Sequence, residues 1–118
     1  MTGVQTCALP IWDNVSVAAN VMFCTHDAIR HVFMYEDKMN YLPHLGEISV
    51  SNNVFIGAGS IIVGPLKIGA NVIIAAGSVL TKDVPDGVIV GGNPARVIGT
   101  YEDLKNKRKK EIEKSSLS

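Results

Sequence analysis

The chain has 118 residues, 11 acidic and 11 basic, and 47% of its residues are hydrophobic. This length fits one domain, and the balanced charge gives no sign of a nucleic-acid or membrane-surface partner. The longest apolar runs fall well short of the roughly 18–20 residues that a membrane-spanning helix needs. Cys7 and Cys24 are too few for a disulfide framework, so we expect a protein of the reducing cytoplasm.

The opening stretch MTGVQTCALPI differs from everything that follows it. It lacks the basic start and the long apolar run of a signal peptide. A common sequencing-library adapter, read with GTG as the start codon, encodes Met1 to Ile11. We therefore expect residues 1–11 to be an artefact, with the native chain continuing upstream. An ordinary disordered N-terminus is the alternative, and in both cases the segment is left out of the fold prediction.

A six-residue repeat fills the middle of the chain. Stepping by six from Val50 reaches an aliphatic residue every time, at Val50, Ile56, Ile62, Ile68, Ile74 and Leu80. Small or aliphatic residues stand four positions after each of these, at Val54, Ser60, Leu66, Val72, Ser78 and Val84. Residues that tolerate positive φ precede the expected strands, at Asn53, Gly59, Asn71 and Gly77. Self-similarity at a fixed period predicts a solenoid.

The repeat fits a triangular coil in which three hexapeptides make one turn of roughly 18 residues. Each side is a short strand that points one large aliphatic side chain inward, and successive turns stack as parallel sheets. A β-sandwich is the alternative, but it would have longer strands of period two joined by hairpin turns. A partial coil lies further upstream, where Val17, Val21 and Phe23 fit the same pattern.

The phrases IGAGSII, AAGSVLTKDVPDG and GGNPARVI resemble the hexapeptide-repeat acyltransferases, closest to the sugar O-acetyltransferases such as galactoside and maltose acetyltransferases. The likeness covers Asp13 to about Thr100. It implies a left-handed parallel β-helix, a hand that the period alone does not fix. It also implies acetyl-CoA as acyl donor, no metal, and a homotrimer with active sites between subunits. We expect the β-helix over 12–98, an inserted loop over 25–47, and a C-terminal helix and tail over 99–118.

The inserted loop holds all three histidines of the chain. In the sugar acetyltransferases a His follows directly where a coil ends and a loop leaves, and His26 stands at that position. The resemblance implies that His26 is the general base, taking a proton from an acceptor hydroxyl that attacks the thioester of acetyl-CoA. Asp27 adjoins it, but neighbours in an extended segment point to opposite faces, so the orienting partner stays unassigned. Cys24 lies in a strand-like run and is expected to be a small core residue and not a nucleophile.

The acceptor site is expected to include Asp27, His31 and Tyr35. The alternatives are that His31 is simply exposed and that the loop aromatics Phe33, Tyr35 and Tyr41 anchor the loop to a neighbouring subunit. His44 is expected to serve packing or the turn.

The resemblance also implies a set of cofactor-binding residues. Ala58 and Ala76 would line the pantetheine groove, and Thr81, Lys82 and Arg96 would face the nucleotide phosphates. Phe55 joins this set, although relatives often have Trp at its position and Ser at that of Ala58.

The segment from Thr100 to Lys114 is expected to form one helix that ends before Ser115. Thr100 and Asp103 resemble a capping box, and acidic residues precede basic ones, as the helix dipole favours. The basic run 107–110 is followed at once by acidic residues, which indicates a solvated helix face and not a nucleic-acid site.

Three functions remain open from the sequence. The first is an O-acetyltransferase acting on a sugar or a polysaccharide precursor. The second is a zinc lyase resembling the γ-class carbonic anhydrases, whose two-histidine spacing is matched by His26 and His31. The third is a non-catalytic hexapeptide subunit that only assembles.

Overall fold

The structure, a computed structural model, describes residues 13–42 and 44–117. The expected adapter segment, residues 1–11, lies outside the described residues. The first part of the coil and the projecting segment contain β1 Val15–Val17, β2 Met22–Cys24, β3 His26–Asp27, α1 Ile29–Asp37 and β4 His44–Leu45. The main coil contains β5 Ile48–Val50, β6 Val54–Ile56, β7 Ile61–Val63, β8 Leu66–Ile68, β9 Val72–Ile74, β10 Val79–Leu80 and β11 Val88–Gly91. The chain ends with β12 Arg96–Thr100 and α2 Tyr101–Leu117.

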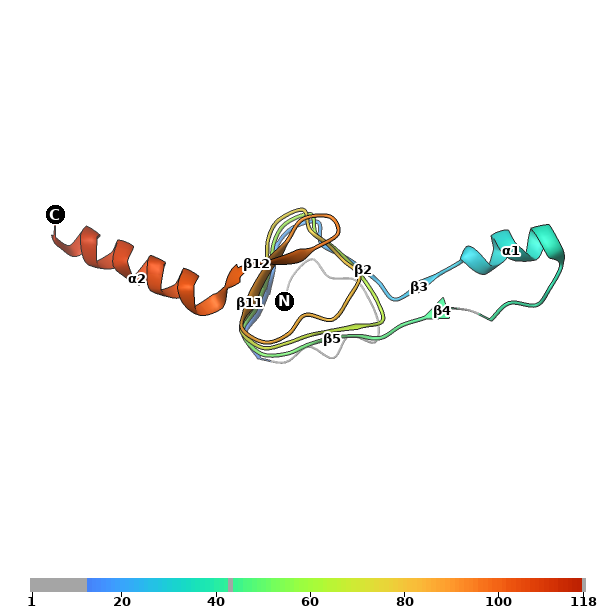
Figure 1. The fold of residues 1–118 in the computed structure, drawn as a ribbon, viewed down its shortest axis with the longest axis horizontal. Coiled ribbons are helices and arrows are strands. Elements are labelled where there is room, and N and C mark those ends of the chain that lie inside the picture. Colours follow the sequence, from blue (N-terminus) through green and yellow to red (C-terminus); the bar gives the residue numbers. More distant parts are fainter. Residues whose placement is uncertain (1–12, 43, 118) are drawn as a thin grey trace.

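The strands wind into a three-sided coil, seen end-on as a triangle in Figure 1. Its sides are the sheets β1-β6-β9-β11, β2-β7-β10 and β5-β8. The stacked strands of the three sides are parallel, and the pairs β5–β8, β6–β9 and β7–β10 join residues 18 apart, as Val54 with Val72. The predicted triangular coil of parallel strands is therefore confirmed.

The core of the coil is the predicted set of inward side chains. All six residues of the six-residue step are at most 1% exposed, and the six that stand four positions later are at most 6% exposed. In a typical strand such as β8 the first and third residues are buried and the middle one faces outward. The inward aliphatic side chains of successive turns thus form one hydrophobic core along the axis of the coil.

The corners of the coil depend on residues in the left-handed region. Asn53 and Asn71 have φ of 57° and 56°, and Gly59 and Gly77 have φ of 73° and 72°, as the sequence predicted. The asparagines also stack: Asn14 Nδ2 donates to Asn53 Oδ1 at 2.7 Å, and Asn53 Nδ2 donates to Asn71 Oδ1 at 3.1 Å. The same corner conformation on successive turns therefore builds a ladder of side-chain amides.

The predicted loop 25–47 is an arm with secondary structure of its own. Strands β3 and β4 pair antiparallel at its base, with His26 opposite Leu45 and Asp27 opposite His44. Helix α1 follows β3, and Lys38 ends it with a φ of 61°. Figure 1 shows the arm projecting from one corner of the triangle, with α1 well away from the coil. Every residue of α1 is at least partly exposed, because the helix packs on nothing but the rest of the arm.

The C-terminal end departs from the coil in two ways that the sequence analysis did not predict. Strand β12 turns back antiparallel to β11, and α2 then leaves the coil on the side opposite to the arm (Figure 1). Asp103 N donates to Thr100 Oγ1 at 3.2 Å, as the capping box predicted. The expected helix end before Ser115 is wrong, since α2 continues to Leu117. Serine carries only a mild helix penalty, so two serines do not stop a helix whose last turn is solvated.

Candidate active site

The candidate active site lies at the corner of the coil where the arm leaves. The chain exits after β2 and returns to β5, and Gly46 N donates to Thr25 O at 2.6 Å to close the base of the arm. On the coil side, Gly64 N donates to Cys24 O at 2.9 Å, which ties the exit to the next turn. His26 therefore lies at the base of the arm, two residues beyond the end of β2.

His26 itself is exposed to solvent. Within residues 13–42 and 44–117 no hydrogen bond to its imidazole is found. Asp27 Oδ1 accepts a hydrogen bond from Ile29 N at 3.1 Å at the start of α1. The partner that orients His26 stays unassigned. Cys24 is half-buried and not part of the core, contrary to expectation, because it occupies an outward position of β2.

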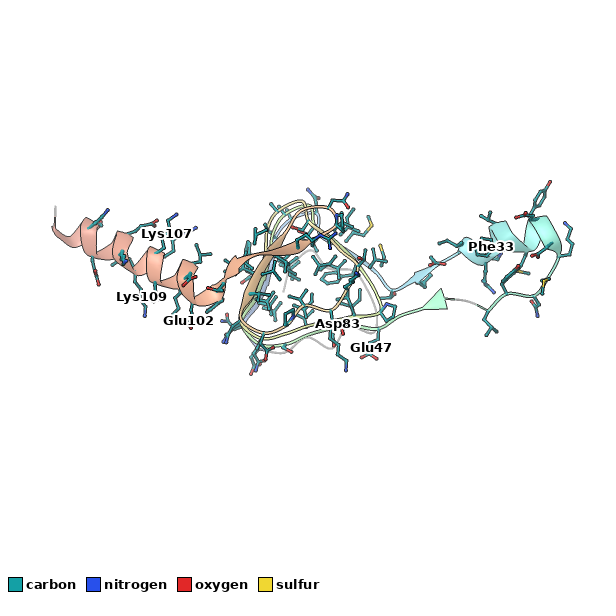
Figure 2. The ribbon with its side chains drawn as sticks, viewed as in Figure 1. Phe33, Glu47, Asp83, Glu102, Lys107 and Lys109 are labelled. Atoms are coloured by element: carbon teal, nitrogen blue, oxygen red, sulfur yellow. The ribbon has the colours of Figure 1, made fainter. Side chains whose placement is uncertain are left out.

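The predicted acceptor residues His31 and Tyr35 are one helical turn apart on α1 and both are exposed. Tyr35 is 81% exposed, and Lys38 Nζ lies 4.9 Å from the centre of its ring. Figure 2 shows the α1 side chains standing free of the coil. These residues therefore reach into solvent from the arm and are not gathered around His26 within one chain.

The other arm aromatics hold the arm together. The rings of Phe33 and Tyr41 are 5.3 Å apart at 56°, and the Tyr41 hydroxyl donates to an Asp37 carboxylate oxygen. Met39 N donates to the other oxygen at 2.9 Å. The Tyr41 bond lowers the pKa of Asp37 from its ordinary value and raises the pKa of Tyr41. Phe33 and Tyr41 thus brace the turn after α1, a role that the sequence analysis did not assign.

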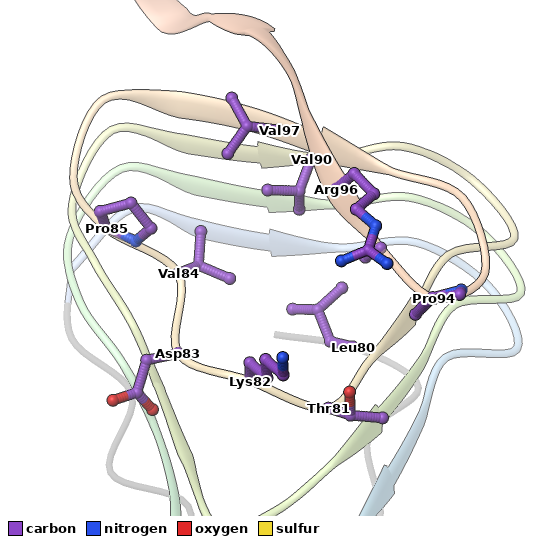
Figure 3. Close-up of a pocket in the computed structure, with 11 residues that line it drawn as sticks. Leu80, Thr81, Lys82, Asp83, Val84, Pro85, Val90, Pro94, Arg96 and Val97 are labelled. Atoms are coloured by element: carbon purple, nitrogen blue, oxygen red, sulfur yellow. The ribbon is translucent and has the colours of Figure 1, made fainter.

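The candidate phosphate-binding residues lie together at the C-terminal end of the coil. Thr81, Lys82 and Arg96 line a cavity of about 490 Å³ whose floor is formed by core residues such as Leu80 and Val90. Figure 3 shows the Arg96 guanidinium turned toward this cavity and the Asp83 carboxylate turned away from it.

Arg96 owes its position to the return of β12, a reversal marked by the glycine-rich GGNP turn in which Gly92 has a φ of 96°. Asp83 Oδ1 accepts a hydrogen bond from Lys67 N at 2.8 Å, so this carboxylate is held on the outside of the coil. The cavity thus combines two cations with an apolar floor.

The remaining cofactor candidates occupy other parts of the coil. Ala58 and Ala76 are exposed on successive turns of one corner, where Gly77 N donates to Ala58 O at 2.9 Å. This corner joins the β6 and β9 side to the β7 and β10 side, whereas His26 and Lys82 lie at the following corner. Phe55 is 45% exposed on the outer face of β6, beside Tyr101. One chain therefore does not bring all the predicted residues into one site.

The described residues contain no cluster of three His, Cys, Asp or Glu side chains placed to hold a metal ion. The zinc alternative needs His31 on a coil face, but His31 lies on α1 in the arm. In the part of the chain that the structure covers, neither helix is long and apolar enough to cross a membrane.

Comparison with known protein families finds a match within the coil. Residues 47–82 match the family model of the bacterial transferase hexapeptide (six repeats). Over 105 residues the chain is 46% identical to Protein CapG of Staphylococcus aureus, an alignment that covers 89% of this chain and 60% of CapG. The sequence of the coil is thus that of a bacterial transferase hexapeptide repeat.

Two solved structures extend the likeness to the fold. A maltose O-acetyltransferase from Clostridium difficile 630 has a TM-score of 0.67 at 38% identity, covering 78% of this chain and 48% of that one. A galactoside acetyltransferase in complex with coenzyme A has a TM-score of 0.71 at 33% identity, covering 83% and 48%. The predicted resemblance to hexapeptide-repeat acyltransferases is confirmed, and it implies a left-handed coil. The chain spans about half the length of the relatives it matches.

Proposed function

We propose that this chain is part of an acetyl-CoA-dependent O-acetyltransferase that acetylates a hydroxyl of a sugar or polysaccharide precursor. The observation that carries the proposal is the position of His26, at the corner where an arm leaves a hexapeptide coil similar to those of acetyltransferases. The coenzyme A in the galactoside acetyltransferase structure supports the donor. Because acetyl-CoA is the donor, we place the reaction in the cytoplasm.

In the proposed mechanism His26 acts as general base in a ternary complex. Its imidazole takes the proton of the acceptor hydroxyl, and the oxygen attacks the thioester carbonyl. The resulting oxyanion collapses, the carbon–sulfur bond breaks, and the proton returns from His26 to the coenzyme A thiolate. A direct transfer of this kind predicts initial-rate plots that intersect, whereas a covalent enzyme intermediate gives parallel lines.

The cofactor site is proposed from charge and shape. Lys82 and Arg96 offset phosphate charge at the cavity at the end of the coil, and Thr81 adds a hydroxyl. The exposed Ala58 and Ala76 let the pantetheine chain approach the backbone closely, and Phe55 is proposed as a further contact.

We propose a homotrimer with the site shared between subunits. The separation of Ala58 and Ala76 from His26 and Lys82 in one chain supports this assembly, since a second copy is needed to bring the two corners together. The outer face of β2, β7 and β10 supports it too: Met22, Ile61 and Val79 form an outward apolar row in register, with Met22 58% exposed. Such a row is normally covered in an assembly. Sedimentation of the protein measures the assembly.

The activity is tested with acetyl-CoA and a panel of sugars, following coenzyme A release with a thiol reagent. We expect His26→Ala to lower kcat by about 100- to 10,000-fold, because a positioned general base contributes on that scale. His31→Ala is the matched control and is expected to keep kcat while raising the KM for the acceptor. A His26→Ala enzyme with kcat within a few-fold of wild type would overturn the assignment of the base.

A further inference from the structure

The outer face of the β5 and β8 side carries a second cavity, close to the base of the arm. This cavity has a volume of about 600 Å³ and is lined by Glu47, Ser49, Pro65, Leu66, Lys67 and Asp83. Figure 2 shows Glu47 and Asp83 on the side of the triangle where the arm leaves. A cavity of this volume is large enough for a small organic ligand. This β5–β8 cavity is lined by neither His26 nor the proposed cofactor residues.

The charged groups around the β5–β8 cavity are not neutralised by one another. Asp83 Oδ1 accepts a hydrogen bond from Lys67 N at 2.8 Å, a bond to the backbone that leaves the Lys67 ammonium free. Within residues 13–42 and 44–117 no ion pair joins this ammonium to the carboxylate of Glu47 or Asp83. All three residues are exposed, so a ligand that enters the cavity can reach their charged groups.

The outward residues of this side are polar, unlike those of the β2, β7 and β10 side. Ser49 and Lys67 are paired in register between β5 and β8, and both neighbours of each along its strand are buried. The core of a subunit contact is depleted of charged residues, whereas a row of this kind is typical of a surface that faces solvent. We therefore expect the β5–β8 cavity to stay open in the assembly.

The mixture of donors and acceptors indicates the chemistry of the ligand. A simple anion meets two carboxylates here and a simple cation meets the Lys67 ammonium, so an ion of either sign matches only part of the cavity. A sugar hydroxyl both donates and accepts hydrogen bonds. The carboxylates of Glu47 and Asp83 accept from such hydroxyls, and the Lys67 ammonium donates to them in charge-assisted bonds. A neutral, hydroxyl-rich ring therefore matches both kinds of polar group.

The β5–β8 cavity lies within reach of a molecule bound at His26. Gly46 N donates to Thr25 O at 2.6 Å across the base of the arm, and His26 and Glu47 each follow one of these two residues. Two steps of about 3.8 Å along the chain and one cross-strand spacing of about 5.5 Å place the Cα atoms of His26 and Glu47 at most about 13 Å apart. Because His26 does not line the cavity, the ring at His26 and a ring in the cavity are different units of one acceptor.

We propose that the β5–β8 cavity binds a further sugar unit of the acceptor, so that this protein acetylates a sugar chain in preference to a free monosaccharide. This inference rests on the proposed acetyltransferase function and narrows its substrate class from sugars to oligosaccharides and polysaccharides. Glu47, Lys67 and Asp83 are acceptor-binding residues in this account, while His26 performs the proton transfer.

The test compares kcat/KM within two acceptor pairs: glucose with maltotetraose, and N-acetylglucosamine with tetraacetylchitotetraose. The wild-type protein is expected to favour the tetrasaccharide of at least one pair by about 10-fold or more. The double variant Glu47→Gln, Lys67→Met keeps the size of both side chains and the Lys67 backbone bond. It is expected to lower kcat/KM for that tetrasaccharide by about 10- to 100-fold, the worth of a charge-assisted hydrogen bond, and to leave the monosaccharide unchanged.

The double variant Glu102→Gln, Lys105→Met makes the same two changes on the exposed part of α2 and is expected to leave all four values unchanged. Two results would overturn the proposal. One is a wild-type protein that uses each monosaccharide as well as its tetrasaccharide. The other is a Glu47→Gln, Lys67→Met protein that loses the monosaccharide and the tetrasaccharide equally, which would assign these residues to the structure of the coil.

A binding measurement separates this inference from the proposed function. If no acceptor is acetylated, the acetyltransferase proposal fails, and calorimetric titration with the two tetrasaccharides decides on the β5–β8 cavity. Binding to wild type that Glu47→Gln, Lys67→Met weakens by about 10-fold or more supports the sugar site on its own. The absence of binding of either tetrasaccharide to wild type would refute it.

Discussion

Asn53 offers a direct test of how the coil turns its corners. Its φ of 57° lies in the left-handed region, and its side chain both accepts from Asn14 and donates to Asn71. Two separate contributions therefore favour asparagine here: its tolerance of the left-handed backbone and its place in the amide ladder. Replacement by alanine removes both, whereas replacement by glycine removes only the ladder.

The two substitutions are expected to lower the free energy of unfolding by different amounts. Each exposed ladder hydrogen bond is worth about 0.5–1 kcal/mol, so losing both costs about 1–2 kcal/mol in either variant. A left-handed conformation costs an alanine about 1–2 kcal/mol, and asparagine and glycine escape most of this penalty. We expect Asn53→Ala to lower the free energy of unfolding by about 2–4 kcal/mol, and Asn53→Gly by about 1–2 kcal/mol.

Urea unfolding followed by circular dichroism measures both variants. All proteins are compared at one concentration, because the stability of an assembly depends on it. Asn106→Ala, on exposed α2, is the control and is expected to stay within about 0.5 kcal/mol of wild type. An Asn53→Ala protein as stable as Asn53→Gly would refute the assignment of backbone strain at this corner.

Three further predictions concern the core, the stacking of turns and the arm. Ile62 is fully buried, so Ile62→Ala is expected to cost about 2–5 kcal/mol in urea unfolding and Ile62→Val about 0.5–1.5 kcal/mol. A Cβ on Gly57 would lie 2.5 Å from the Ala76 nitrogen, so Gly57→Ala is expected to cost about 1–3 kcal/mol by forcing two turns apart. Asp37→Asn is expected to lower the raised pKa of Tyr41 toward its ordinary value, read from tyrosine absorbance at high pH.

Each of these has a contradicting result. Equal costs for the alanine and valine variants of Ile62 would contradict the burial of that side chain, and an unchanged midpoint for Gly57→Ala would contradict the close contact. A tyrosine titration that Asp37→Asn does not alter would contradict the Tyr41 bond. The two pKa shifts set the pH range in which the hydrogen bond between Tyr41 and Asp37 stabilises the arm. The bond orders the arm only above the lowered pKa of Asp37 and below the raised pKa of Tyr41.

The coil was predictable because its rules are local and repeat. An inward aliphatic at each sixth position and a left-handed residue at the corner suffice, and Ile62, Asn53 and Gly59 all occupy their predicted places. Gly57 follows the same local rule, because the backbone of the next turn leaves no room for a Cβ at this position. The residues within each repeat thus determine both the core and the spacing of the turns, and no contact between parts far apart in the sequence has to be known.

The arm and the C-terminal end were not predictable in the same way. Helix α1 lies outside the six-residue repeat and buries none of its residues fully, so the rules that predict the coil do not predict this helix. The bracing of Tyr41 by Asp37 depends on how the arm folds back on itself. The reversal that brings Arg96 over the coil had one signal in the sequence, the glycine-rich turn at Gly92.

The places of the candidate site residues along the coil were predictable from the sequence, but their arrangement in space was not, and their roles stay predictions. His26 is at the exit of the arm, as the resemblance implied, and Lys82 and Arg96 share a cavity. The sequence analysis did not predict that Ala58 lies at a different corner of the triangle from His26 and Lys82. That separation is seen only when the turns are stacked in the structure.

The most direct test of the account is thermal unfolding of the protein with and without acetyl-CoA. At a hundred times the dissociation constant the ligand should add about 2.7 kcal/mol to the free energy of unfolding, because it binds only the folded coil. We predict this shift for wild type and for His26→Ala, and its loss in the double variant Lys82→Gln, Arg96→Gln. A cooperative transition in wild type that acetyl-CoA does not move would contradict the claim that this coil binds the acyl donor.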